Sequence, residues 1–429
     1  MKPITNQPKE RLFSPYHAFV IAILAILQFT IVLDFMVLSP LGAILLDKLH
    51  INTSQFGMVV SAYAFSAGVS GLLAAGFADK FDRKKMLLFF YTGFILGTVL
   101  CAIAPDFHFL LIARIITGLF GGVISSVSFA IIADLFKMEV RGRVMGFVQM
   151  SFAASQVLGI PVGLYLANHL GWHSPFWMIA IFGFMVGVVI LIYMKPVTGH
   201  LATKPANPFL HLAKTISTPR YLLAFGTTTL LATGGFMLMP FASAFTVQNL
   251  GITLDDLPFL YLVTGISAII FGPLIGTLSD KLGKYPVFVM GSVITIVMVV
   301  IYTNLGPISL WMLMFINVLL FLGVTSRIIS SSALIMGIPE LRDRGAFMSI
   351  NSSVQQIAGG IGSAVAGLIV VQTASGKILH YNWLGYVVVV AVLIVMSLMY
   401  LVNRSVQQKK QAVAQVATAD EVLADSSHT

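Results

Sequence analysis

Charged residues are scarce in this sequence of 429 residues. They make up 10% of the chain, whereas a typical soluble domain has roughly 25%. So few charges cannot cover a water-facing surface, and 58% of the residues are hydrophobic, with a mean hydropathy of +0.94. The composition therefore excludes an ordinary soluble protein and predicts that lipid surrounds most of the chain.

Cysteine is almost absent as well. Cys101 is the one cysteine in the sequence, which excludes a disulfide framework and a multi-cysteine metal site. No glycine-rich loop ends in Gly-Lys-Ser or Gly-Lys-Thr, which argues against a pump driven by ATP hydrolysis. The nine histidines have no metal-binding spacing. We predict that the protein is not an enzyme and that it needs no metal or cofactor.

Long apolar runs are the main feature that is present. A membrane-spanning helix needs roughly 20 mostly apolar residues. Lipid offers no hydrogen-bonding partner to the backbone, so such runs must form helices. The sequence predicts an all-α polytopic membrane protein with twelve transmembrane helices. These fall near residues 17–41, 56–78, 86–104, 108–133, 144–168, 174–194, 221–247, 259–279, 286–305, 308–336, 346–372 and 383–403.

The basic residues indicate the orientation of these helices. With the N-terminus in the cytoplasm, 21 of the 25 Lys and Arg residues fall on the cytoplasmic side and 2 on the other side. This follows the positive-inside rule. The net charge of +9 is then topological and does not indicate a nucleic-acid partner. We expect a multi-pass protein of the inner (plasma) membrane with both termini in the cytoplasm.

Composition also predicts how the chain is divided. Residues 195–219 are polar and contain four prolines, which favours a cytoplasmic linker between two six-helix bundles, residues 1–194 and 220–405. Residues 406–429 are rich in Gln, Ala, Ser and Asp. We expect this last segment to be a disordered cytoplasmic tail.

The two predicted bundles share an internal repeat. Residues 75–84 (AGFADKFDRK) correspond to residues 276–284 (GTLSDKLGK), which places Asp79 and Asp280 201 residues apart. Arg-Gly pairs follow at 141–142 and 344–345, an offset of 203. Small residues of the fifth and eleventh runs repeat at an offset of 204. Such repeats are typical of transporters that bind substrate between two bundles near the middle of the membrane.

The two loop sequences resemble the signature of the major facilitator superfamily, although Asp82 stands where the first loop usually has Gly. Arg114-x-x-x-Gly118 in the fourth helix and residues 159–163 (GIPVG) in the fifth resemble motifs of its twelve-helix drug and sugar:proton antiporters. In those motifs Gly and Pro are adjacent, whereas here Ile160 separates Gly159 from Pro161. The resemblance covers nearly the whole chain and implies two pseudo-symmetric six-helix bundles.

One carboxylate, Asp34, lies deep in a predicted helix. A charged residue there costs roughly 2.5–3.5 kcal/mol, so it is a functional candidate by default. Arg114 lies at a similar depth, roughly 10 Å from the outer face at 1.5 Å per residue, and is the expected partner. Burial favours a neutral carboxyl group and a nearby guanidinium favours a charged one, so a change in wetting could load and release a proton. The alternative is a static pair that fixes helix packing.

Several other side chains are candidates for the substrate cavity. Thr30 and Thr117 share helix faces with Asp34 and Arg114, and Phe and Met suit an adaptable apolar cavity. Arg327 could bind an anionic group of the substrate, hydrogen-bond to helix carbonyls, or extend toward the cytoplasm. The glutamines could bind substrate or another helix. The full set is Gln28, Thr30, Thr117, Gln149, Gln156, Phe236, Met239, Arg327, Gln355 and Gln356.

Two further groups are predicted to control opening. The resemblance implies a cytoplasmic gate in which the repeated loops hold the two halves together, and its residues here are Asp79, Arg83, Asp280 and Lys284. The alternative is a set of solvated charges. Gly159, Pro161 and Gly163 would bend the fifth helix and let a neighbour approach closely, through either plain packing or a hinge.

Together these features predict a secondary active transporter, most simply one that exports a small molecule, a drug or a metabolite, in exchange for protons by alternating access. Uptake or facilitated diffusion of a nutrient is an alternative, and a non-transporting sensor or assembly partner is another. The expected partners are a small-molecule substrate, protons and the lipid bilayer, with the protein acting as a monomer.

Overall fold

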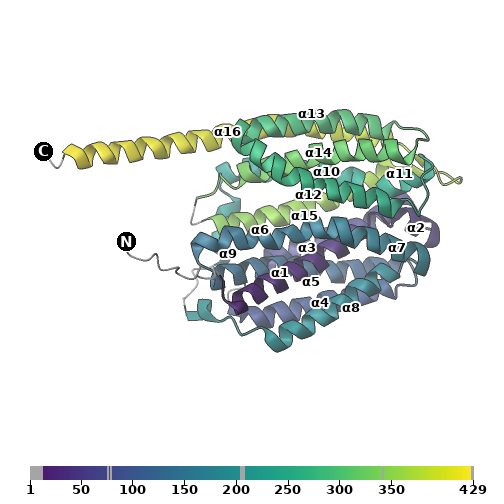
Figure 1. The fold of residues 1–429 in the computed structure, drawn as a ribbon, viewed down its shortest axis with the longest axis horizontal. Helices are drawn as coiled ribbons and strands as arrows, with labels where there is room; N and C mark the ends of the chain where they lie inside the picture. The colour runs from purple at the N-terminus through teal and green to yellow at the C-terminus, as the bar shows by residue number, and fades with distance from the viewer. Residues whose placement is uncertain (1–12, 75–76, 78–79, 203–207, 341–342, 427–429) are drawn as a thin grey trace, which may run out of the picture.

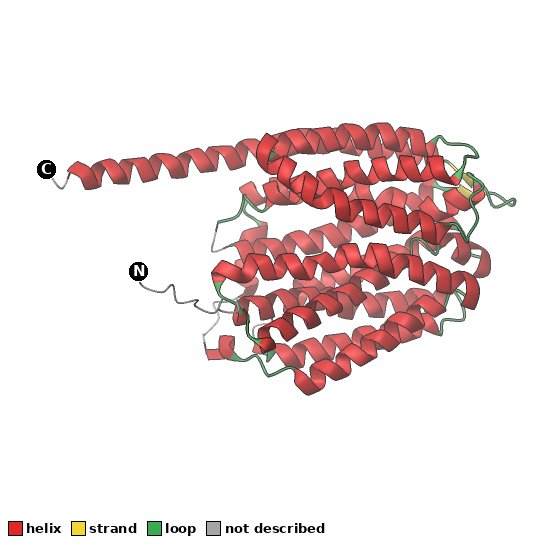
Figure 2. Cartoon of the chain, viewed as in Figure 1, coloured by secondary structure: helices red, strands yellow, loops and turns green. Residues whose placement is uncertain are grey.

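The structure is a computed structural model that describes residues 13–74, 77, 80–202, 208–340 and 343–426. Within these ranges the chain is helical apart from its loops and one short antiparallel strand pair, β1 (Val371–Gln372) and β2 (Ile378–Leu379) (Figure 2). The all-α fold class is confirmed.

The long helices of the first half run side by side across the molecule (Figure 1). A short helix, α2 (Gly42–Lys48), follows the first of them. The long helices are α1 (Pro15–Val37), α3 (Thr53–Ala74), α4 (Arg83–Ala102), α5 (Phe107–Leu135), α6 (Met138–Ala154) with its continuation through a π turn η2 (Ser155–Gly159) into α7 (Ile160–Leu170), and α8 (Ser174–Tyr193).

The second half repeats this arrangement. Between the halves lie a 3-10 turn η3 (Gly199–Ala202) and the short helix α9 (Pro208–Ile216). The long helices are α10 (Pro219–Leu238) with its continuation through η4 (Met239–Phe241) into α11 (Ala242–Gln248), α12 (Leu257–Leu282), α13 (Lys284–Thr303), α14 (Leu310–Ile335), α15 (Arg344–Ile369) and α16 (Tyr381–Ser426).

Eleven helical segments of the described chain are long and apolar enough to cross a membrane. The remaining expected span corresponds to α15, which has 26 residues but carries Ser, Asn, Gln and Gly along its length. It still packs lengthwise against α3 of the first half, and polar residues such as Ser353 and Ser363 are buried there. The two-bundle architecture is thus the predicted one, and α15 is its least apolar member.

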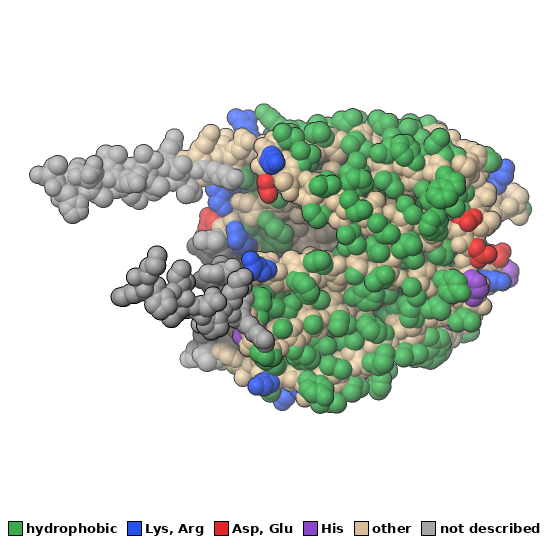
Figure 3. All heavy atoms as spheres, in the orientation of Figure 1, with side chains coloured by type: hydrophobic (Ala, Val, Ile, Leu, Met, Phe, Trp, Pro, Cys, Tyr) green, Lys and Arg blue, Asp and Glu red, His purple; other side chains and the backbone are tan. Residues whose placement is uncertain are grey.

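The two ends of the molecule differ. The described chain begins with α1 and ends with α16 at the same end of the molecule (Figure 1). Lys and Arg side chains gather there (Figure 3), and it is called here the basic end. The opposite end carries α2, α11 and the β1–β2 hairpin (Figure 1) and is called the hairpin end.

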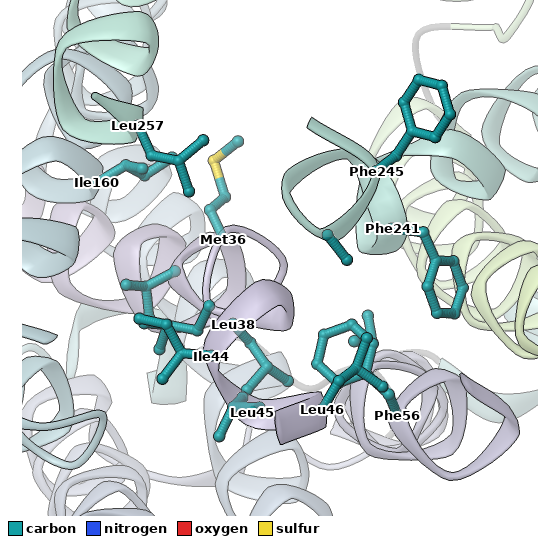
Figure 4. Close-up of a cluster of buried hydrophobic side chains, with 14 of the residues drawn as sticks. Met36, Leu38, Ile44, Leu45, Leu46, Phe56, Ile160, Phe241, Phe245 and Leu257 are labelled. Carbon is teal, nitrogen blue, oxygen red and sulfur yellow. The ribbon is translucent and has the colours of Figure 1, made fainter. Parts of the chain in front are cut away.

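The halves are joined firmly at the hairpin end. Apolar side chains from α1, α2, α3 and α7 meet others from η4, α11 and α12, as Phe56, Phe241 and Leu257 illustrate (Figure 4). Three hydrogen bonds cross between the halves there. They run from Thr53 Oγ1 to Val370 O (2.5 Å), from Ser243 Oγ to Ser39 O (3.1 Å) and from Asn168 Nδ2 to Leu254 O (2.7 Å).

Toward the basic end the halves part on one side. The space-filling view shows a hollow between them that opens in that direction, on the face formed by α6 and α12 (Figure 3). On the far side α3 and α15 stay in contact. They are so close there that a Cβ added at Gly68 of α3 would lie 3.0 Å from Ser353 O of α15. The molecule is therefore closed at the hairpin end and parted at the basic end.

The segment after residue 405 differs from the expected disordered tail, because α16 continues to Ser426. The turn formed by residues 406–409 packs onto the rest of the second half. Val406 is buried, and Lys409 Nζ donates to the carbonyls of Ile338 and Pro339 at 3.1 and 2.9 Å. These carbonyls follow the C-terminus of α14, where a cation is favoured. The Gln, Ala and Lys residues that follow are good helix formers.

Candidate functional site

The structure brings Asp34 and Arg114 together in the interior of the first half. Arg114 Nη1 donates to Asp34 Oδ2 at 2.7 Å, and both side chains have no exposed surface. Thr98 on α4 donates to the other carboxylate oxygen at 3.3 Å. Three helices therefore position one carboxylate, and the pairing expected from depth alone is present.

The guanidinium of Arg114 is held on one side by an aromatic ring. Its Cζ lies 4.6 Å from the centre of the Tyr63 ring on α3, a cation–π contact. Its Nε and Nη2 atoms have no hydrogen-bond partner among the described residues. A buried pair that loses one partner leaves an uncompensated charge at a cost of about 3–5 kcal/mol, so the charge state of Asp34 is tied to the position of Arg114.

Glycines allow the helices around this pair to approach so closely. A Cβ at Gly118 of α5 would lie 2.5 Å from Tyr63 O on α3, and one at Gly97 of α4 would lie 2.6 Å from Thr117 Oγ1 on α5. Any larger side chain at these positions would push α3 or α4 away from α5. The small residues therefore set the distance at which Tyr63 contacts Arg114.

The pair is connected to the second half by aromatic packing. Phe35, which follows Asp34 in the chain, packs against Tyr63 with ring centres 5.4 Å apart. It also packs edge-on against Phe236 of α10, with ring centres 5.7 Å apart. A displacement of Asp34 or Tyr63 would thus be felt directly at the contact between the halves.

Three polar candidates lie within the first half rather than between the halves. Thr30 Oγ1 donates to Leu27 O at 2.8 Å and lies 3.3 Å from the Tyr91 hydroxyl. Gln28 accepts a hydrogen bond from Ser125 at 3.1 Å. Thr117 donates to Ala113 O at 2.7 Å. Each is buried and makes a hydrogen bond within its own bundle.

Gln149 and Gln156 face the space between the halves. Ser155 contacts α1 through Phe29 O at 3.1 Å, and Val157 contacts α12 at Gly265. Gln156 lies between these two directions and is half-buried, while Gln149, about two turns earlier, is exposed. Both amides are therefore available to a molecule in the hollow.

The second half also has two glutamines, Gln355 and Gln356 on α15, near the space between the halves. Ser353 of α15 lies close to Gly71 of α3, and a side chain at Gly359 would meet Phe236 of α10. Gln355 and Gln356 lie between these two contacts; the first is exposed and the second half-buried. Phe236 and Met239 are half-buried at the end of α10 and in η4.

Arg327 stands apart from this set. It lies on α14, is 6% exposed, and its Cζ is 5.9 Å from the centre of the Phe288 ring. Its Nε and the hydroxyl of Ser330, one turn further along, are both buried without a hydrogen-bond partner among the described residues. One alternative for Arg327 was a hydrogen bond to helix carbonyls. Among the described residues, the buried Nε of Arg327 has no such bond.

The predicted cytoplasmic gate is only partly visible, because Asp79 lies outside the described residues. Arg83 pairs with Asp134 at the end of α5, with Nε and Oδ2 3.1 Å apart. Lys284 pairs with Asp280 one turn away. Both pairs lie within one half, so these described contacts do not hold the halves together in a state that is parted at the basic end.

The motif of the fifth helix is a site of close packing. A Cβ at Gly159 would lie 2.5 Å from Leu33 Cδ1, and one at Gly163 would lie 3.0 Å from Val37 Cγ2, both on α1. The π turn η2 comes just before Pro161, the second residue of α7. A π turn absorbs the hydrogen bond that proline cannot make and often marks a functional position.

Sequence reasoning missed Tyr63, Thr98 and Phe35. Each lies in a predicted helix among many residues of the same kind, and nothing in the local pattern distinguishes it. Their one sequence signal is that Tyr63 is a polar aromatic residue inside an apolar run, where a buried partner is expected.

Comparison with known proteins agrees with the geometry. The sequence profile of the Major Facilitator Superfamily matches residues 24–238 and again 224–423. An uncharacterised MFS-type transporter of Bacillus subtilis (strain 168), YceJ, is 30% identical over 62% of this chain and 67% of that protein. A probable sugar efflux transporter of Helicobacter pylori (strain ATCC 700392 / 26695) is 24% identical over 77% of this chain and 82% of that protein.

The fold has solved counterparts. The crystal structure of a bacterial homologue of the human lysosomal transporter Spinster, in an inward-facing and unoccupied conformation, superposes with a TM-score of 0.73 at 17% identity. The match covers 92% of this chain and 98% of that one. With two copies of the family profile in sequence and the fold in structure, this chain belongs to the Major Facilitator Superfamily of membrane transporters.

Proposed function

We propose that this transporter exports a small molecule, a drug or a metabolite such as a sugar, in exchange for protons by alternating access. The observation that carries the proposal is the fully buried Asp34–Arg114 pair beside the Phe35–Phe236 contact between the halves. The name of the Helicobacter pylori relative, a probable sugar efflux transporter, supports the direction of transport.

Asp34 is the proposed proton carrier and Arg114 its counter-charge. When Asp34 is ionised, its carboxylate holds Arg114 and accepts from Thr98. A proton on Asp34 removes that charge, and Arg114 is left buried without a counter-ion, which is costly in a low-dielectric interior. The protonated state therefore favours a rearrangement that gives Arg114 water or another acceptor.

The rearrangement can reach the second half through Phe35. Its ring lies between Tyr63, which covers Arg114, and Phe236 of α10. If protonation shifts Arg114 and Tyr63, the edge-on contact with Phe236 must shift as well. Closely packed side chains move between discrete arrangements rather than continuously, so this contact could favour one orientation of the halves over the other.

The orientation of the chain assigns the two ends of the molecule to the two sides of the membrane in the proposed cycle. The positive-inside rule places the basic end in the cytoplasm, so the structure would be the inward-facing state. A substrate would enter the hollow from the cytoplasm and meet Gln149, Gln156 and Gln356. After the halves rock, Asp34 would take a proton from the other side of the membrane while the substrate leaves.

Proton movement in inverted membrane vesicles tests the proposal. Vesicles with wild-type protein, Asp34→Asn and the control Asp47→Asn, which changes an exposed carboxylate at the hairpin end, would receive a panel of drugs, sugars and amino acids. We expect compound-dependent proton release in wild type and Asp47→Asn and none in Asp34→Asn, which should still bind the compound.

Each other result points elsewhere. Full coupling in Asp34→Asn would rule out Asp34 as the carrier. Substrate flux without proton movement in wild type would indicate uptake or facilitated diffusion. An absence of flux for every compound, together with dependence on a partner protein, would indicate a sensor or assembly role.

A further inference from the structure

A groove on the membrane-facing surface of the second half has no part in the mechanism above. It lies between α13 and α16 near the basic end and has a volume of about 580 Å³. Tyr285 of α13 forms one wall. The other residues lie on one face of α16, and they are Leu393, Met396, Ser397, Tyr400 and Leu401.

The groove exists because a small residue sits among large ones. Ser397 is exposed, and its hydroxyl turns back to Leu393 O at 3.4 Å. Around it, Tyr285 and Tyr400 pack edge-on with ring centres 5.7 Å apart. The Tyr285 hydroxyl donates to Met396 O at 3.4 Å, which fixes this wall against α16.

The position of the groove limits what can fill it. Leu393 to Leu401 spans nine residues, or eight steps of 1.5 Å and roughly 12 Å along the helix, from the tyrosine pair toward the middle of the membrane. Tyrosines are typical of the interface between membrane and water. An apolar groove that leads inward from that interface faces lipid acyl chains, because lipid surrounds a transporter at this depth.

Positive charge lies directly above the groove. Arg404 follows Tyr400 by one helical turn toward the basic end, and it is exposed. Within the described part of the chain no acidic side chain pairs with Arg404. Lys281 is exposed at the end of α12, and Lys284 begins α13, although Asp280 offsets its charge.

We propose that this groove binds a phospholipid with an anionic headgroup, with one acyl chain along Ser397 and the phosphate at Arg404. The apolar wall and the unpaired cation lie in the order in which a lipid of the basic-end leaflet presents its chain and its phosphate. Basic pockets between helices on the cytoplasmic side are suited to such headgroups. The inference requires only that the chain spans a membrane.

Lipid binding to the purified full-length protein tests this site. Native mass spectrometry would follow titration with phosphatidylglycerol and with phosphatidylcholine of the same acyl chains. We expect tighter binding of phosphatidylglycerol to the wild type. Arg404→Gln should weaken that preference about fivefold, since one cation near the surface contributes about 1 kcal/mol. Ser397→Trp, which fills the groove, should remove the first bound lipid of either kind.

Matched controls separate the groove from general lipid contact. Lys85→Gln removes an exposed cation at the same end of the first half, and Ile394→Trp adds the same ring to α16 on an exposed position outside the groove. Both should bind as wild type, and thermal unfolding would verify that every variant is folded.

Three results would overturn the proposal: equal affinity for the two lipids, an equal loss in Lys85→Gln, or an unchanged first lipid in a folded Ser397→Trp. Glycerol 3-phosphate distinguishes a headgroup site from a lipid site. Displacement of the bound lipid by this soluble phosphate at the same concentration as the lipid would show that the acyl chain contributes nothing, which would also overturn the proposal.

Discussion

At the scale of single residues, the chemistry of this protein concentrates on one charge pair. Asp34 and Arg114 are buried, separated from water and linked to three helices besides α1, through Thr98, Tyr63 and Arg114 itself. Such a pair contributes little net stability when intact, but either charge alone is expensive. Its presence in an apolar bundle is more easily explained by a change of charge during transport than by packing.

The cost of separating the pair can be measured. Arg114→Ala leaves a buried carboxylate and should lower the free energy of unfolding by about 3–5 kcal/mol. The double variant Asp34→Asn/Arg114→Met removes both charges and should recover much of that loss. Stability of Arg114→Ala should rise as the pH falls, because a proton on Asp34 removes the uncompensated charge. Denaturation in detergent across a range of pH values would provide the comparison.

Arg143→Ala, at an exposed arginine of α6, is the control for this series and should unfold as wild type does. If the double variant were as unstable as Arg114→Ala, the loss would come from packing volume rather than from charge. In that case the static interpretation of the pair would be strengthened.

The sequence was sufficient to pair these two residues because depth in a membrane can be counted along a helix. Asp34 and Arg114 are rare charges in apolar runs, at similar distances from the same face. Tyr63 and Thr98 could not be assigned in the same way. A tyrosine or threonine in a helix costs little, occurs often, and acquires its role only when the helices are packed together.

At the scale of helices, small residues decide which elements touch. A Cβ at Gly118 would lie 2.1 Å from Ser66 Oγ and 2.5 Å from Tyr63 O, and one at Gly122 would lie 2.2 Å from Ala67 O. The carbonyl oxygens belong to the backbone and cannot rotate away. In lipid, helices associate through close contacts of this kind, so α3 and α5 are joined by shape more than by apolar burial.

Gly118→Ala tests this close approach. The added methyl group should force α3 from α5 and lower the free energy of unfolding by about 1–3 kcal/mol, the usual cost of overpacking. It should also reduce transport, because Tyr63 would move away from Arg114. Thermal unfolding and flux would be measured together with Gly146→Ala, where a Cβ of α6 has open space.

The control should be as stable as wild type or slightly more so, since alanine is the better helix former. Equal stability of Gly118→Ala and Gly146→Ala would mean that α3 and α5 can separate without loss. The glycine contacts would then have no part in positioning Tyr63.

Sequence reasoning at this scale succeeded where lipid imposes a rule and failed where contacts between elements decide. Eleven of the twelve expected spans coincide with described helices that are long and apolar enough to cross a membrane, because an unpaired backbone is intolerable in lipid. The helix through residues 406–426 was missed because its first turn is stabilised by the carbonyls after α14, which lie some 70 residues away in sequence. The pair of Arg83 with Asp134, 51 residues further along the chain, likewise forms only when α4 and α5 are packed together.

At the scale of the whole molecule, the structure corresponds to one of the two states of the proposed transport cycle. All three side-chain hydrogen bonds described between the halves lie at the hairpin end, while the hollow opens at the basic end (Figure 3). For alternating access the hairpin-end contacts must break, and new ones must form at the basic end. Residues of the repeated loops are well placed for the second step, since they lie on both halves at that end.

Cysteine accessibility would identify this state and its orientation together. The native Cys101 is buried, so Cys101→Ser gives a background without a reactive thiol. On this background Gln149→Cys and Gln355→Cys should react with a membrane-impermeant maleimide from the side of the termini, because both positions are exposed. Ser243→Cys, which replaces a buried residue of the hairpin-end contact, should be protected from both sides.

Ser375→Cys, exposed in the β1–β2 hairpin, is the control for the opposite side and should react only there. Rapid labelling of Ser243→Cys from the hairpin side, with Gln149→Cys protected, would mean that the resting protein faces the other way. A transported compound that binds the second state more tightly should shift the labelling pattern toward that state, since a ligand changes such an equilibrium only through a difference in its affinity for the two states. The size of the shift would therefore measure this difference in affinity.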